Sequence, residues 1–341
     1  MSFLKKQITL VLAFLAFVTF VVFDLSLISG AWANPSVPSV IVAIIDTGID
    51  PNHTQLTQEI WKDPESKETL IYGWNFVTNR PNPKDENGHG THISGIIRSV
   101  VYPKHSKFAF PRKVSLMPLK YYAEGSVGSI NLEHSVKAIY YAIDHGAKII
   151  NYSGGGPGFS REEFLAIQKA QAHGVLIVAA AGNEKQDTDL EENFYYPSAY
   201  RAHGLTNIIS VAATDQNNKL LTSSNWGHKN VDVAAPGEKI YSTLPNNRYG
   251  TMSGTSQATA FVSGVAAMLL AKNPRLTPQK LRELIMSSVD LSNALKGKVS
   301  SGGHVNPLKA ALGFRDDLLV HSSLSWLAQQ PTFLQEIVKI P

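Results

Sequence analysis

The chain alternates short apolar runs with longer stretches in which apolar residues recur at helical spacing. Residues 40–45 are continuously apolar and rich in β-branched side chains, which is typical of a strand buried on both faces of a parallel sheet. Similar runs follow at 114–121, 147–151, 175–181, 207–212 and 231–234. These six runs predict the strands of a mainly parallel sheet.

Between the runs, apolar residues return every three or four positions, which is the period of a helix with one buried face. The stripe predicted for 131–145 consists of Leu132, Val136, Ile139, Tyr140 and Ile143. The stripe predicted for 161–173 consists of Phe164, Leu165, Ile167 and Ala170. Strand–helix alternation over this length predicts a doubly wound α/β fold, with helices on both faces of the sheet in three α/β/α layers.

The N-terminal 33 residues have the layout of a signal peptide. Lys5 and Lys6 precede sixteen uncharged residues, 8–23, and Ala31 and Ala33 offer a small-residue cleavage site. The alternative is an uncleaved anchor, although sixteen helical residues span only about 24 Å of a ~30 Å hydrocarbon core. Cleavage predicts a secreted or periplasmic protein, and an uncleaved segment predicts a membrane-anchored one.

Composition narrows the remaining chemistry. The 341 residues are 43% hydrophobic and 17% charged, which indicates a folded chain. The absence of cysteine excludes thiolate nucleophiles and cysteine-based metal sites. A net charge of +4, without any run of more than two basic residues, argues against nucleic-acid binding. Because no linker divides the chain, we predict one domain over 37–315, followed by an apolar extension of unknown role, 316–341.

Three segments offer candidate chemistry. Asp46 directly follows the first predicted strand, and the carboxyl ends of parallel strands are where sites form. His89 lies between two glycines. Ser256 lies where an apolar helix begins, so unpaired backbone N–H groups can stabilise negative charge beside it. Each residue alone also has a structural explanation, as a turn aspartate, a structural histidine or an N-cap serine.

The order Asp, His, Ser over 44–50, 87–95 and 250–260 resembles the subtilisin-like serine peptidases, the subtilases. Segments 151–155 and 179–184 are also similar to this family, and the likeness runs from Val40 to about Leu312. The resemblance implies a secreted serine endopeptidase that cleaves polypeptides through an acyl-enzyme intermediate.

The resemblance also implies roles for individual residues. Asp46, His89 and Ser256 would form the catalytic triad, and Asn183 would bind the oxyanion. Backbone pairing with the substrate would fall to Ser153, Gly154 and Gly155. We further expect Glu184, beside Asn183, to favour a basic residue at the cleaved bond. His92 is expected to be structural, and His53 is expected at the surface or in a turn.

The chain departs from the family pattern in several places. Gln257 and Ala260 replace a usual Met and Pro, neither of which carries a proton in the mechanism. Cleavage after Ala33 would leave about six residues before the first strand. We therefore expect no recognisable propeptide, and control by unaided folding, a separate inhibitor or a chaperone.

The sequence also gives expectations for cofactors, for calcium binding and for the oligomeric state. The chemistry requires no cofactor, and we predict no metal among the site residues. Structural calcium is compatible with the family, but Gln55 stands where many relatives have an aspartate ligand, and 100–113 does not resemble their calcium loop. We therefore expect the strong family calcium site to be absent, and the protein to be a monomer.

Two other functions remain open. The first is a serine esterase on the same fold, against which the absence of G-x-S-x-G counts. The second is an exported, catalytically inactive binding protein, against which the presence of Asp46, His89, Asn183 and Ser256 counts.

Overall fold

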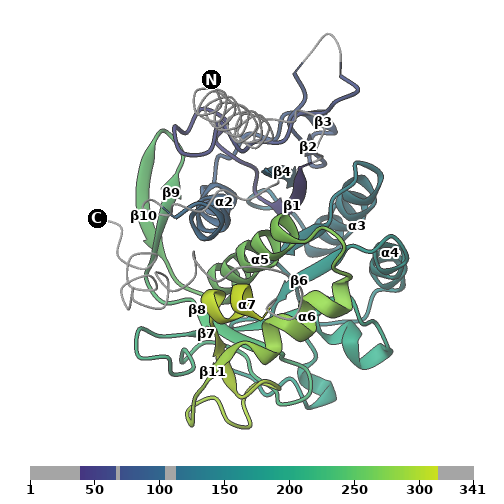
Figure 1. The fold of residues 1–341 in the computed structure, drawn as a ribbon. Coiled ribbons are helices and arrows are strands. Elements are labelled where there is room, and N and C mark those ends of the chain that lie inside the picture. The colour runs from purple at the N-terminus through teal and green to yellow at the C-terminus, as the bar shows by residue number, and fades with distance from the viewer. Residues whose placement is uncertain (1–38, 67–69, 104–112, 314–341) are drawn as a thin grey trace, which may run out of the picture. The chain divides into compact units, whose positions relative to one another are not determined.

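The computed structural model describes residues 39–66, 70–103 and 113–313. The segments 1–33 and 316–341, on which the signal-peptide and C-terminal predictions fall, lie outside these ranges. The described residues form a ten-stranded sheet in the order β11-β12-β8-β7-β6-β5-β1-β4-β2-β3 (Figure 1). All neighbours are parallel except the outer pairs β11–β12 and β2–β3.

The six predicted strands are confirmed, and each begins and ends within three residues of its apolar run. They are β1 (Val40–Asp46), β4 (Val114–Lys120), β5 (Ile149–Tyr152), β6 (Leu176–Ala180), β7 (Ile208–Thr214) and β8 (Val233–Pro236). The sequence did not predict the four short strands at the edges, β2 (Trp74–Asn75), β3 (Arg80–Pro81), β11 (Val289–Leu291) and β12 (Gly303–Val305).

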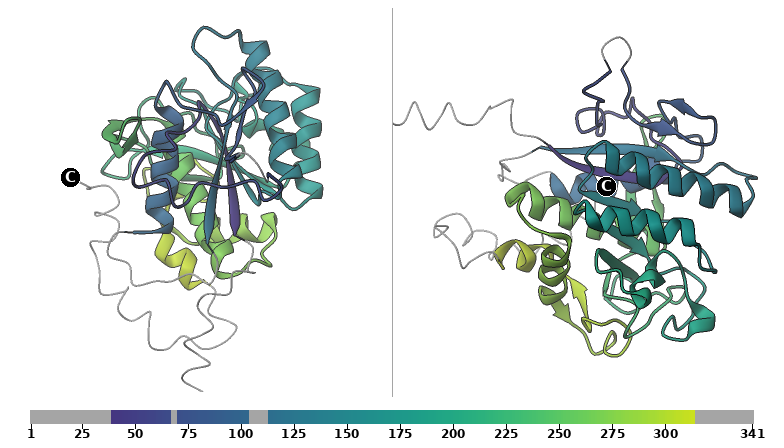
Figure 2. Two further views of the ribbon diagram at one scale, coloured as in Figure 1. Left: turned by 90° about the horizontal axis from the view of Figure 1, so that it is seen from above. Right: turned by 90° about the vertical axis from the view of Figure 1, so that its right-hand side faces the viewer.

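Helices cover both faces of the sheet, which confirms the three-layer architecture (Figure 2). One face carries α2 (His89–Val101), α5 (Thr255–Lys272), α6 (Pro278–Ser287) and α7 (Pro307–Leu312); the other carries α3 (Gly128–Asp144) and α4 (Arg161–Ala172). Two short 3-10 helices, η1 (Glu191–Asn193) and η2 (Ser198–His203), follow β6. Alternate residues of β1 enter the two cores, Val42 and Ile44 on one side and Ala43 and Ile45 on the other. This double burial explains why the strand is continuously apolar.

The predicted stripes of α3 and α4 were partly wrong. In α3 the buried residues are Ser135, Ala138, Ile139, Ala142 and Ile143, so small side chains replace Leu132, Val136 and Tyr140. In α4 the buried residues are Glu163, Ala166, Ile167 and Ala170, while Leu165 is 43% exposed. Alanine and serine share the buried face with Ile139, Ile143 and Ile167, while Val136, Tyr140 and Phe164 pack at its margin and are only partly buried.

A two-stranded hairpin stands apart from the main sheet. It consists of β9 (Ile240–Leu244) and β10 (Arg248–Met252), which pair antiparallel. Asn246 and Asn247, in the connecting turn, have φ of 64° and 58°, left-handed conformations that asparagine tolerates better than most residues. β10 runs directly into the residues before α5, so the hairpin is adjacent in sequence to Ser256.

The order of the central strands determines where the site lies. From β1 the chain goes to β4 on one side and then to β5 on the other, so the direction of winding reverses at β1. Ligands of open α/β sheets bind at such a reversal, beyond the carboxyl ends of the strands. Asp46 is the last residue of β1. Among the described residues, no helix has both the length and the apolar character to cross a membrane.

Candidate active site

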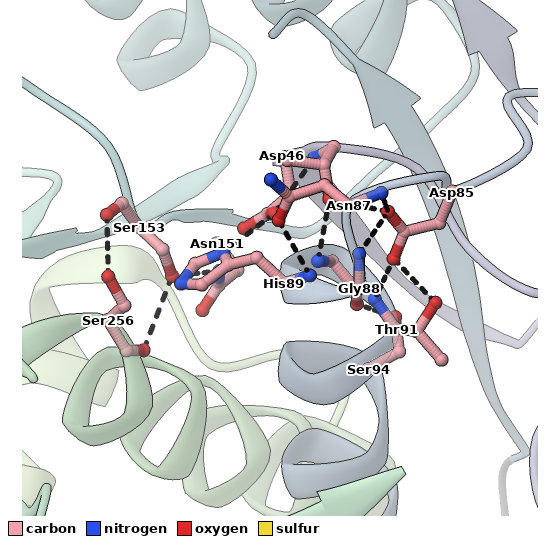
Figure 3. A network of polar contacts seen from close by, with 12 residues as sticks. Asp46, Asp85, Asn87, Gly88, His89, Thr91, Ser94, Asn151, Ser153 and Ser256 are labelled. Atoms are coloured by element: carbon pink, nitrogen blue, oxygen red, sulfur yellow. Dashed lines mark hydrogen bonds and ion pairs between the residues drawn. The ribbon is translucent and has the colours of Figure 1, made fainter. Parts of the chain in front are cut away.

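Asp46 and His89 form a hydrogen-bonded pair at the end of β1 (Figure 3). His89 Nδ1 lies 2.8 Å from Asp46 Oδ1, and the same oxygen accepts a hydrogen bond from the Thr47 N–H. A Cβ on Gly90 would lie 2.2 Å from the carbonyl oxygen of Gly48, so only glycine allows the start of α2 to approach β1 this closely. The glycine after His89 therefore permits the pair to form.

The carboxylate controls the protonation of His89. Burial by itself would lower the pKa of the imidazole, but the charge of Asp46 and its hydrogen bond outweigh burial and raise the pKa above 6.5. Asp46 is 3% exposed, which keeps its carboxylate largely out of water. A histidine in this setting is oriented by Asp46 and accepts a proton more readily than a free imidazole does.

Ser256 is the second residue of α5, and its hydroxyl bonds to the end of β5. Ser256 Oγ donates to the carbonyl oxygen of Ser153 at 3.0 Å, and Ser153 Oγ donates to the carbonyl oxygen of Ser256 at 3.3 Å (Figure 3). Among the described residues no hydrogen bond joins Ser256 to His89. The structure thus brings Asp46 and His89 together directly, while Ser256 must turn its hydroxyl away from Ser153 to reach His89.

Asn183 lies beside the start of α5. Its Oδ1 accepts hydrogen bonds from the Thr255 N–H at 3.0 Å and from Thr255 Oγ1 at 3.2 Å. These bonds leave Nδ2 as the group of Asn183 that can donate to a ligand. Within the part of the chain that the structure describes, the Ser256 N–H also has no hydrogen-bond partner, as expected in the first turn of a helix. Two donors therefore remain open near Ser256.

The glycine segment that follows β5 has an open edge. No backbone hydrogen bond among the described residues uses the N–H or C=O groups of Gly154 or Gly155, and Gly155 is exposed. The next residue, Gly156, pairs antiparallel with Tyr196. An extended peptide can add to such an edge through its main chain. The segment predicted to bind substrate is thus available for pairing.

Asp85 organises the loop before His89, and sequence reasoning missed it. The side chain is 2% exposed and accepts five hydrogen bonds. Its Oδ1 accepts from Thr47 Oγ1 and from the N–H groups of Asn87 and Gly88, and its Oδ2 accepts from the N–H and Oγ1 of Thr91. Burial by itself would raise the pKa of Asp85, but these bonds hold the pKa below 3.8. The one signal in the sequence was an acid four residues before His89.

The β9–β10 hairpin holds the next residues of α2. Ser242 Oγ and Thr243 Oγ1 donate to the carbonyl oxygens of His92 and Thr91, both at 2.7 Å. His92 Nε2 lies 3.0 Å from the carbonyl oxygen of Ile240, and burial lowers the pKa of His92 to about 4. The expected structural role of His92 therefore agrees with its contacts.

His53 agrees with one of the two places expected for it. It lies in a turn, where its N–H donates to the carbonyl oxygen of Asp50 at 3.3 Å, but it is fully buried rather than at the surface. Its Nε2 lies 3.2 Å from the carbonyl oxygen of Arg248 in β10. Glu184 is exposed, and its Oε2 accepts a hydrogen bond from Asn225 Nδ2 at 2.7 Å. Across the described ranges, no three histidine, aspartate or glutamate side chains group as metal ligands would.

An aspartate, a histidine and a serine in this chain order are the arrangement of serine peptidases that are built on a doubly wound sheet. The model of the Subtilase family matches residues 38–308, and the chain belongs to this family. It is 34% identical to thermitase of Thermoactinomyces vulgaris over 280 residues, which cover 82% of this chain and 91% of thermitase. It is a subtilisin-like serine endopeptidase.

Other relatives are similar over most of the chain, and one of them is named for an intracellular location. Subtilisin DY of Bacillus licheniformis is 34% identical over 73% of this chain and 83% of its own length. The major intracellular serine protease of Bacillus subtilis is 34% identical over 72% of each chain. A cold adapted subtilisin-like serine proteinase of known structure aligns with a TM-score of 0.61 and 29% identity, over 78% of this chain and 86% of that one. The family therefore gives the activity without giving the compartment.

Proposed function

We propose that Asp46, His89 and Ser256 form the catalytic triad of this endopeptidase. The observation that carries the proposal is the 2.8 Å contact between His89 Nδ1 and Asp46 Oδ1, beside a helix that begins at Thr255 with Ser256 in its first turn. A serine of ordinary pKa needs a base to take its proton during attack, and His89 Nε2 is the free nitrogen of the pair.

The reaction proceeds in two halves. Ser256 Oγ turns from Ser153 and attacks the scissile carbonyl carbon while His89 Nε2 accepts its proton. His89 then donates this proton to the leaving amine, which breaks the peptide bond and leaves an acyl-enzyme. In the second half, water attacks the acyl carbon while His89 Nε2 takes a proton from it. His89 then returns this proton to Ser256 Oγ as the bond between Oγ and the acyl carbon breaks and the carboxylic acid product leaves. Throughout, Asp46 keeps the imidazole in one tautomer and stabilises the imidazolium.

Two further groups act on the substrate. The N–H of Ser256 and Nδ2 of Asn183 stabilise the negative charge that develops on the carbonyl oxygen. The main chain of Ser153, Gly154 and Gly155 pairs with the extended polypeptide as an added strand. The open donors beside Ser256 and the open edge after β5 support these two assignments.

A fluorophosphonate probe tests the triad. The probe should label the wild type but not Ser256→Ala, and the wild type alone should hydrolyse casein. Ser256→Ala should lower kcat by about a million-fold, a size measured on a subtilisin itself and taken over here. Asn207→Ala, at a buried position away from Ser256, serves as a control for altered folding.

The outcomes separate the alternatives. A wild type that neither labels nor cleaves casein is the exported binding protein. A wild type that labels and cleaves p-nitrophenyl esters, but no peptide, is the serine esterase. Either result overturns the proposed triad function in peptide hydrolysis.

We further propose that the protein is exported to the exterior or the periplasm, with removal of residues 1–33. The basic start, the apolar run and the small residues before Asn34 support this proposal. Expression in an exporting host should give a product whose N-terminal sequence begins at Asn34. A membrane-bound product that begins at Met1 would identify an anchor. Refolding without added protein distinguishes unaided folding from the use of a separate inhibitor or chaperone.

The enzyme is proposed to work as a monomer that lacks the strong calcium site of its family. The residue Gln55, in place of an acidic ligand, supports the second part. A chelator should leave the melting temperature unchanged. A fall that calcium reverses, and magnesium does not, would contradict the proposal.

A further inference from the structure

A cavity of about 480 Å³ lies beside the glycine segment that follows β5. Its lining includes Gly155 and Gly156 from that segment and the side chains of Tyr121, Tyr152, Asn131 and Glu163. The volume falls within the range of about 300–1,000 Å³ that is usual for ligand pockets. The cavity is thus large enough to receive a substrate side chain.

Glu163 is the unusual residue of this cavity. It lies in the first turn of α4 and is 2% exposed. Buried carboxylates are normally paired with a cation. Among the residues that the structure describes, no lysine, arginine or histidine pairs with Glu163. Its hydrogen-bond partners there are hydroxyls, Tyr200 at 2.9 Å and Tyr152.

The local sequence would normally turn this side chain the other way. Ser160 caps α4 by accepting from the Glu163 N–H at 3.2 Å, which is half of a capping box. In a complete box the glutamate would accept from the Ser160 N–H. Here Tyr200 Oη accepts from that N–H at 3.2 Å, and the Glu163 carboxyl enters the interior instead. The helix cap therefore does not explain the position of the carboxyl.

The remaining lining favours a positive guest. Asn131 Oδ1 is buried and has no hydrogen-bond partner within the described residues. Tyrosine rings, such as those of Tyr121 and Tyr152, attract cations at their faces. Burial raises the pKa of Glu163, although the hydroxyls of Tyr200 and Tyr152 act against this shift. A bound cation would oppose the effect of burial and favour the carboxylate.

We propose that this cavity, the Glu163 cavity, is a specificity pocket for an arginine or lysine side chain of the polypeptide substrate. The inference rests on the proposed function, because the cavity receives substrate only if a peptide pairs with the segment after β5. Gly155 lies two residues beyond Ser153, whose carbonyl oxygen is 3.0 Å from Ser256 Oγ. Since a strand advances about 3.3 Å per residue, the basic side chain belongs two to four residues from the cleaved bond.

The test uses quenched fluorescent peptides of one sequence, in which each of the four positions on either side of the cleaved bond is in turn arginine, citrulline or norleucine. Citrulline has the shape of arginine without its charge. At one position two to four residues from the cleaved bond, arginine should raise kcat/KM about tenfold or more over citrulline. Glu163→Gln should reduce this ratio to about twofold or less, and the ratio is compared within the variant, so a change in its overall activity does not affect the result.

The matched control is Glu162→Gln, at the exposed acid one residue earlier in the same turn, which should keep the full ratio. Inhibition of the wild type by n-butylguanidinium, compared with neutral n-butylurea, gives a second measurement that needs no variant. The cation should inhibit the more strongly.

Several results would overturn the inference. They are a wild type with no basic preference, a preference that survives Glu163→Gln, and a preference that Glu184→Gln abolishes instead. Cleavage of all peptides without preference would overturn only the proposed specificity of the Glu163 cavity and would leave the proposed function intact. If the wild type neither cleaves the peptides nor reacts with the fluorophosphonate probe, both the specificity of the cavity and the proposed function are overturned.

Discussion

The helices that carry His89 and Ser256 begin in opposite ways. At the start of α2, the N–H groups of His89, Gly90 and Thr91 donate to Asn87 Oδ1, Thr47 Oγ1 and Asp85 Oδ2. At the start of α5, the Thr255 N–H donates to Asn183, and the Ser256 N–H has no partner among the described residues.

The difference follows from the task of each residue. The base of the proposed mechanism must be held in one orientation. The Gly90 N–H bonds directly to Thr47, the residue after β1, and the Thr91 N–H bonds to Asp85, which also accepts from Thr47. The negative charge that develops on the substrate carbonyl beside the proposed nucleophile must be stabilised. The unbonded N–H of Ser256, at the positive end of α5, is available for this. In the proposed mechanism the start of α2 therefore contributes stability, and the start of α5 contributes to catalysis.

The largest expected effect comes from a substitution beside the start of α5. Asn183→Ala removes the proposed oxyanion donor, and kcat should fall by about 100- to 1000-fold, a loss measured on a subtilisin and taken over here. The free energy of unfolding should fall by only about 1 kcal/mol, because Thr255 loses one capping acceptor. Steady-state kinetics and urea unfolding measure the two quantities. A larger loss of stability than of transition-state binding would contradict the comparison.

Asp85→Asn tests the start of α2. It should lower the free energy of unfolding strongly and kcat only weakly, the reverse of Asn183→Ala. The amide retains one acceptor oxygen but places an NH₂ group against donors, so the free energy of unfolding should fall by about 2–3 kcal/mol. At temperatures where the variant is folded, kcat should fall by less than about tenfold, because no proton moves through Asp85. Asp187→Asn, whose carboxylate is partly exposed, is the control and should be nearly neutral. Equal stability of Asp85→Asn and the wild type would show that the network is dispensable.

The pH dependence of stability gives a smaller effect of defined sign. The pKa of Asp85 is held below 3.8 in the folded chain, so its contribution is present above pH 3.8 and is lost as the pH falls through the folded value. The stability difference between wild type and Asp85→Asn should therefore shrink on acidification. Melting temperatures of both proteins from about pH 3 to about pH 7 measure the change. A difference that grows toward low pH would reverse the assigned sign.

The smallest effect concerns the acid limb of activity. The charge of Asp85 contributes to the raised pKa of His89, after the larger influences of burial and Asp46. In the proposed mechanism His89 acts as a base only when it is neutral, so kcat/KM should rise with pH through this pKa. In Asp85→Asn the limb should move to lower pH, whereas Asn183→Ala should leave it in place. An acid limb that moves in Asn183→Ala and stays in place in Asp85→Asn would contradict the roles assigned to the two helix starts.

The sequence predicted the central sheet better than the surfaces of its helices. Strands such as β1 are buried on both faces, and a continuous apolar run is a direct consequence of that burial. The stripe of α4 was right for Ile167 and Ala170, but Glu163 and Ala166 are buried beside them, where Phe164 and Leu165 were expected. A buried carboxyl is decided by partners distant in the chain, such as Tyr200, which local periodicity does not contain.

The candidate site divides in the same way. Asp46, His89 and Ser256 were predicted from short motifs, and the fold places each at or next to the end of an element. The role of Asp85 depends on contacts with Thr47 from another loop, and the Ser256–Ser153 bond depends on two segments 103 residues apart. The β9–β10 hairpin was missed because its strands mix apolar and polar residues and contain no continuous apolar run, so only its turn asparagines gave a signal.

That hairpin also sets how the enzyme should fail on heating. Its turn accepts and donates hydrogen bonds to the loop after β1 at Asp50 and Thr54, β9 holds the first turns of α2, and β10 leads into Ser256. Opening this one small sheet would let His89 and Ser256 move apart while the main sheet stays closed. Heat inactivation is then a local event, and amide protons of β9 should exchange with solvent at the rate at which activity disappears.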